Sequence, residues 1–154
     1  GPPVLRFYIL RQRQRVKETD PELGDKPLGE VALTPTRIYV RQVLDVIRNC
    51  DVHGVAHITG GGFDENIPRI LQEGQGIHVE EGSWEILPIF RFLEKHGNIS
   101  HREMFNIFNM GVGMVLAMDE SEARKAIDIL ASHGDRATVI GSVTATPGVD
   151  IKLL

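Results

Sequence analysis

The sequence has a single cysteine among its 154 residues, so no disulfide can form within the chain. It also has no apolar run near the roughly 18 residues that a membrane-spanning helix needs. Its formal net charge is −4, which provides no general attraction to nucleic acid or to an anionic membrane surface. These absences exclude an internal disulfide scaffold, argue against nucleic-acid and membrane partners, and favour a cytoplasmic protein.

The residues that are present have the composition of an ordinary folded domain. Apolar residues make up 42% of the chain and charged residues 25%, which is typical of globular proteins. The length suits one domain with a real core better than two. We expect an N-terminal lead-in and linker over residues 1–27, where Pro21, Gly24 and Pro27 interrupt regular structure, and a compact domain over residues 28–154.

Apolar residues in the compact part alternate between strand and helix spacing. Strands are predicted at 52–58, 77–79, 112–118, 137–143 and 149–153, the last two across a Pro147-Gly148 turn. Helices are predicted at 43–49, 66–72, 86–97, 100–108 and 121–132, and an extended loop at 31–40. This alternation predicts an α/β domain of the α+β type, with a mixed β-sheet covered by helices.

The most informative segment runs from His57 to Arg69, where an apolar strand leads into three consecutive glycines and then a helix. Gly60, Gly61 and Gly62 allow positive φ and a close approach to a ligand, and free N–H groups at a helix start favour an anion. The segment lacks both the lysine of a nucleotide-hydrolase phosphate loop and the spaced glycines of a dinucleotide fold. Two hypotheses remain: a phosphate cradle, or a tight turn without a ligand.

Side chains close to this turn are candidates for contacts with an anion. Arg69 follows the glycines and Arg37 lies in the loop before the first helix, and each is either a bidentate phosphate ligand or a surface arginine. His57 is either a ligand for phosphate or ribose, or a structural residue at a strand end. Although His53 and His57 are four residues apart, they fall in a predicted strand, so no metal site is expected.

No residue carries the signature of a catalytic nucleophile or of an acid–base pair. Cys50 is expected to be a small core residue or half-buried. The neighbouring acidic residues are expected at the surface: Asp64, Glu65, Glu80 and Glu81. The run from Phe108 to Met114 places glycines at the start of a strand, which indicates either a simple turn or bulge, or a backbone that passes close to another group.

Several runs of residues occur together in the order and spacing of one family. They are Thr34–Val40, His57–Phe63 with Asn66–Arg69, Glu103–Met104 with Phe108–Met114, and Ile140–Gly141. Through these runs the chain, from about Leu28 to Val143, resembles the C-terminal half of the phosphoribosylformylglycinamidine cyclo-ligases, also called aminoimidazole ribonucleotide synthetases. The region before Leu28 resembles the family poorly.

The resemblance implies a ligase reaction of purine biosynthesis. In the family, ATP and Mg²⁺ activate the formyl oxygen of formylglycinamidine ribonucleotide, and ring closure gives aminoimidazole ribonucleotide, ADP and phosphate. It also implies that most of the ATP and metal apparatus lies in a preceding N-terminal domain, with the active site in the cleft between the two halves, and that the full-length protein is a homodimer. The fold implied is partly ferredoxin-like, and the C-terminal half alone is expected to be inactive.

A binding role is expected for nine residues, while no catalytic residue and no metal ligand is predicted. The phosphate cradle is assigned to Thr59, Gly60, Gly61 and Gly62, the same pocket to His57, Asn66 and Arg69, and the cleft wall to Arg37 and Asn109. Two alternatives stay open. One is another ATP-using enzyme of the same superfamily, such as formylglycinamidine synthetase, selenophosphate synthetase or thiamine-phosphate kinase, and the other is a standalone module that binds a phosphorylated metabolite or a partner protein.

Overall fold

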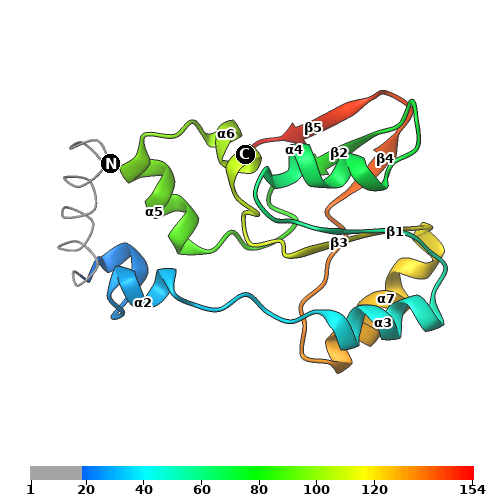
Figure 1. The fold of residues 1–154 in the computed structure, drawn as a ribbon, viewed down its shortest axis with the longest axis horizontal. Helices are drawn as coiled ribbons and strands as arrows, with labels where there is room; N and C mark the ends of the chain where they lie inside the picture. The colour runs from blue at the N-terminus through cyan, green and yellow to red at the C-terminus, as the bar shows by residue number, and fades with distance from the viewer. Residues whose placement is uncertain (1–18) are drawn as a thin grey trace, which may run out of the picture.

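The computed structural model describes residues 19–154 (Figure 1). This part begins with a 3-10 helix, η1 (Pro21–Leu23), and a short helix, α2 (Leu28–Ala32). The η1 segment contacts helix α5 (Pro88–Gly97), and Glu22 pairs with Lys95. The extended loop predicted at 31–40 is wrong at both ends, where α2 continues through Ala32 and a helix begins at Val40, while residues 33–39 lie outside helices and strands as expected of a loop. Residues 1–18 of the predicted lead-in lie outside the described residues.

The strands form two sheets instead of the single one expected. Strands β1 (Val52–His57) and β3 (Met114–Met118) pair antiparallel. In the second sheet, β2 (Gly76–Glu80) lies between β4 (Gly141–Thr144), which is antiparallel to it, and β5 (Gly148–Lys152), which is parallel. One antiparallel sheet, one mixed sheet and the helices confirm the α+β class.

The sequence suggested that the last two strands pair with each other across the Pro147-Gly148 turn. The structure shows that they do not. They flank β2 on opposite sides, so the connection between them crosses the end of β2 at Gly76. A Cβ atom at Gly76 would overlap with the carbonyl oxygen of Thr146 and would lie 2.6 Å from that of Gly148. A glycine at this position lets the chain cross over.

The helices follow the predicted order with shifted ends. Those not yet given are α3 (Val40–Asn49), α4 (Gly62–Asn66), η2 (Ile67–Ile70), α6 (His101–Ile107) and α7 (Glu120–Ser132). The helix expected at 66–72 begins at Gly62 and changes to 3-10 geometry at Ile67, because Pro68 has no N–H for an α-helical bond. The helix expected from residue 86 starts at Pro88. Ser100 caps α6 as predicted, accepting from the Glu103 N–H at 3.4 Å.

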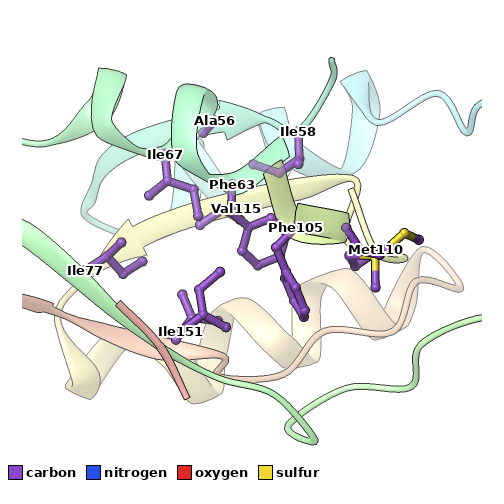
Figure 2. Packing of buried hydrophobic residues seen from close by; sticks show 11 residues of the cluster. Ala56, Ile58, Phe63, Ile67, Ile77, Phe105, Met110, Val115 and Ile151 are labelled. Atoms are coloured by element: carbon purple, nitrogen blue, oxygen red, sulfur yellow. The ribbon is translucent and has the colours of Figure 1, made fainter. Parts of the chain in front are cut away.

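The main core lies where α4, α6 and the two sheets meet. Figure 2 shows side chains from these elements pointing toward one another, with Phe63 and Phe105 at 0% exposure. A smaller cluster packs α3 against α7 on the other side of β1 and β3, and it contains Cys50, which is buried as predicted (Figure 1). Within residues 19–154, no helix combines the length and apolar character needed to cross a membrane.

Candidate functional site

The structure brings three of the family-like runs together at one end of β1 and β3. The Ile58 N–H donates to the Gly113 carbonyl oxygen, with 2.9 Å between nitrogen and oxygen. The ring of Tyr39 lies edge-on to that of His57, with 6.0 Å between centroids. A Cβ atom at Gly113 would overlap with the Tyr39 hydroxyl. The runs 34–40, 57–69 and 103–114 therefore form one candidate site around the start of the glycine turn.

The three glycines of the turn differ in what the fold demands of them. Gly61 has a φ of 89° and is the N-cap of α4, and Gly62 has a φ of 54°. A Cβ atom at Gly62 would overlap with the Phe105 carbonyl oxygen of α6, so this glycine allows two helices to approach closely. Gly60 is exposed and has no positive φ, and within residues 19–154 a Cβ atom there would meet nothing within 4 Å. The fold explains Gly61 and Gly62 but leaves open space at Gly60.

Asn66 holds this turn from the inside. Its side chain is 3% exposed, and its amide nitrogen donates to the carbonyl oxygens of Gly62 at 2.7 Å and of Gly60 and Thr59 at 3.3 Å. Its amide oxygen also lies 3.4 Å from the Thr59 hydroxyl, which donates to it. These contacts engage the Asn66 amide with the loop itself, so Asn66 supports the turn.

The remaining predicted site residues have other contacts or an exposed position. Arg37 pairs with the mostly buried Asp135 in the loop after α7. Arg69 is exposed in η2, and within residues 19–154 no hydrogen bond joins either arginine to the glycine turn. The Asn109 side chain accepts from the Gly111 N–H at 3.0 Å and so shapes its own turn. Among residues 19–154, the structure thus joins Asn66 to the glycine turn by hydrogen bonds and shows no such bond from Arg37 or Arg69.

Two residues that the sequence did not mark belong to this region. One is Tyr39, described above, and the other is Arg102 of α6. Arg102 makes two hydrogen bonds of 2.7 and 2.6 Å to the carboxylate of Asp64, which lies in the first turn of α4. These bonds raise the pKa of the Arg102 guanidinium above its ordinary value. Asp64 keeps partial exposure, at 27%, and the sequence did not show its pairing with Arg102, because no local pattern connects residues 38 positions apart.

A partly buried polar cluster joins the residue after β2 to α5 and α6. The Glu81 side chain is 7% exposed, so its predicted surface position is wrong, whereas Glu65 and Glu80 are exposed as predicted. His101 lies between two carboxylates, with Nε2 2.9 Å from Glu81 and Nδ1 3.0 Å from Glu94. Burial lowers the pKa of His101, but the hydrogen bonds with both glutamates outweigh it and the pKa lies above its usual range.

The raised pKa of His101 predicts a pH-dependent stability. A folded-state pKa above the unfolded value of about 6.5 means that the stabilising contribution is complete below that pH. It is lost as the pH rises through the folded-state value. Urea unfolding at pH 6 and pH 8.5 is therefore expected to show a larger fall in the free energy of unfolding for the parent than for His101→Gln. The exposed His53→Gln is the control, and an unchanged pH dependence in His101→Gln would contradict the assignment.

Among the residues that the structure describes, no group of three or more His, Cys, Asp or Glu side chains is arranged to hold a metal ion. His53 instead lies 3.4 Å from the neighbouring Asp51, and His57 packs against Tyr39.

The fold and the site define a mixed α+β domain with a glycine turn between a strand and a helix, braced by a second helix. A family model described as AIR synthase related protein, C-terminal domain, matches residues 7–153. The chain belongs to this family. Because the match begins at residue 7, the expectation that the region before Leu28 resembles the family poorly is wrong.

Curated relatives agree with this family. The chain is 53% identical over 155 residues to the phosphoribosylformylglycinamidine cyclo-ligase of Bifidobacterium longum (strain DJO10A), covering 99% of this chain and 45% of that protein. It is 52% identical over 123 residues to the protein of the same name from Bacillus cereus (strain ZK / E33L), covering 80% and 36%. The chain thus spans less than half the length of these relatives.

A solved structure supports the fold alone. E. coli HypE matches with a TM-score of 0.57 at 22% identity, over 80% of this chain and 40% of that one. This likeness shows a shared fold, and at this identity it carries no argument about activity.

Proposed function

We propose that this chain is the C-terminal part of a phosphoribosylformylglycinamidine cyclo-ligase, a cytoplasmic ligase that converts formylglycinamidine ribonucleotide to aminoimidazole ribonucleotide. The 53% identity across nearly the whole chain to a relative of that name supports this function over another ATP-using enzyme of the superfamily. The meeting of three separate runs at one end of β1 and β3 supports a shared binding site there.

The open space at Gly60 is the observation that carries the proposed site. We assign the ribose phosphate of the substrate to the turn from Thr59 to Gly62, where a backbone without side chains allows close approach. Asn66 keeps the turn in shape through bonds to its carbonyl oxygens. Binding energy from a phosphate held here would orient the reacting formyl and amidine groups, which lie elsewhere on the substrate.

The contribution of this chain is binding and orientation. We assign ATP and Mg²⁺ mainly to the preceding half of the full-length protein, in keeping with the share of the relatives that this chain spans. When bound, they would supply the phosphoryl group that activates the formyl oxygen. The chain alone is proposed to be inactive, with the cleft completed by the other half, and the full-length enzyme is proposed to be a homodimer.

A charge placed at Gly60 is expected to prevent phosphate binding. In titration calorimetry with formylglycinamidine ribonucleotide, Gly60→Asp should bind at least about tenfold more weakly than the parent, equal to about 1.4 kcal/mol, because like charges repel at short range. Gly60→Asn is the matched control, since it has nearly the same shape without the charge. Gly61 is unsuitable for this test, because a side chain there would be strained by its φ of 89° and would overlap with Glu65.

The possible results separate the proposals. Binding that is weakened in Gly60→Asn and weaker still in Gly60→Asp supports the phosphate cradle, because both side chains fill the space at Gly60 and only aspartate adds a charge. Equal affinity in all three proteins contradicts a cradle at Gly60. If the parent shows no binding, this half does not hold the substrate phosphate by itself.

A further inference from the structure

The ion pair between Arg102 and Asp64 lies beside the glycine turn without forming part of it. Asp64 is in the first turn of α4, directly after the glycines, and Arg102 is the second residue of α6. Both side chains keep partial contact with solvent, at 41% exposure for Arg102 and 27% for Asp64. A partly exposed pair of this kind adds little to global stability, so its value is expected to be local.

We propose that Arg102 is a positioning residue for the glycine turn, and that its pairing with Asp64 neutralises a carboxylate that would otherwise repel the substrate phosphate. This inference rests on the proposed phosphate cradle at Thr59 to Gly62. It assigns to α6 a role in substrate binding, although no residue of α6 lies in the turn.

The geometry of the two helices supports the positioning part. The α6 backbone already touches the turn, since Phe105 lies where a side chain at Gly62 would be. The rings of Phe63 and Phe105 pack at 5.5 Å between centroids. The Arg102 guanidinium adds a fork of two hydrogen bonds to Asp64, and one of its nitrogens lies 3.5 Å from the Val149 carbonyl oxygen of β5. A planar fork sets direction as well as distance, so it holds the start of α4 in one orientation.

The charges at the start of α4 support the neutralising part. This turn carries two carboxylates, Asp64 and Glu65, where a phosphate is proposed to bind. The Glu65 carboxylate lies against Gly61, but Glu65 is exposed, so a phosphate that enters the turn can displace its side chain into solvent. Asp64 is held by Arg102 and cannot move away while the pair is formed. Pairing with Arg102 cancels the charge of Asp64 and therefore removes the repulsion between this carboxylate and the phosphate, although the carboxylate stays in place.

The first experiment measures amide hydrogen exchange without any ligand. Arg102→Met keeps much of the side-chain volume and removes the fork, and it should speed exchange several-fold at residues 60–66 while leaving β2 and α7 unchanged. Arg136→Met is the matched control, because Arg136 pairs with Glu85 at 3.4 Å on an open surface. If exchange at the turn is the same in Arg102→Met and the parent, Arg102 does not position it.

The second experiment measures affinity for formylglycinamidine ribonucleotide by calorimetry. Arg102→Met is expected to bind about tenfold more weakly than the parent. The double variant Arg102→Met with Asp64→Asn should recover part of this loss, although its turn remains mobile. Equal affinity in the single and double variants would overturn the neutralising role.

The two experiments distinguish a failure of the role inferred for Arg102 from a failure of the proposed phosphate cradle. If the parent itself does not bind the ribonucleotide, the cradle fails for this chain and the neutralising role fails with it. Hydrogen exchange still decides whether Arg102 positions the turn, because that measurement needs no ligand.

Discussion

Replacing Gly62 with alanine is expected to lower the free energy of unfolding by about 3 kcal/mol or more. Two costs combine at this position. The φ of 54° is unfavourable for a residue with a Cβ atom, and that atom would overlap with the Phe105 carbonyl oxygen. Because the obstacle is backbone of a packed helix, rotation of a side chain cannot relieve it, so α4 and α6 must separate.

Urea unfolding followed by circular dichroism measures this loss. Gly60→Ala is the matched control, because the same added methyl group would meet open space at a φ that is not positive. Its stability should stay within about 0.5 kcal/mol of the parent. A Gly62→Ala variant as stable as Gly60→Ala would show that α4 and α6 do not approach each other as described.

Replacing Ile67 with alanine is expected to cost about 3 kcal/mol. Ile67 is 0% exposed and lies in the main core, where the helix after the glycine turn faces both sheets (Figure 2). Removing three carbon atoms loses their transfer free energy and leaves a cavity that close-packed neighbours fill only in part.

Ile38→Ala removes the same atoms from a side chain that is 80% exposed, so it serves as the control. Its effect on the urea midpoint should be small, within about 0.5 kcal/mol. A loss in Ile38→Ala equal to that in Ile67→Ala would contradict the burial of Ile67. An unchanged slope of the denaturant dependence in both variants would show that the comparison concerns stability alone.

Much of the secondary structure could be predicted from the sequence. The strand at 52–58, the Ser100 cap of α6, the helix at 121–132 and the glycine turn all depend on residues that are neighbours in the chain. Periodicity and capping are local effects, so a single sequence contains them. The helix that starts at Gly62 was predicted to begin only at residue 66. Glycine is an unusual first helical residue, so the sequence did not indicate this boundary.

Some features of the candidate site could be predicted from the sequence, and others depend on tertiary contacts. The sequence marked the glycines of the turn, but their separate reasons were not visible in it. A glycine is required at position 62 because the Phe105 carbonyl oxygen, from a residue distant in sequence, lies where a Cβ atom would be. Within residues 19–154, no neighbour requires a glycine at position 60. The placement of Arg37 beside Asp135 is also a tertiary effect, because both lie in loops whose approach no local rule sets.

The α+β class, most of the helices and strands, the position of the glycine turn and the resemblance to the family follow from the sequence alone, because they depend on local order and on runs of residue types. The arrangement of the strands in two sheets, the burial of Glu81 beside His101 and the pairing of Arg102 with Asp64 are visible only in the folded chain. Such pairings join residues far apart in the chain. Their energies arise only when packing brings the partners within hydrogen-bond distance.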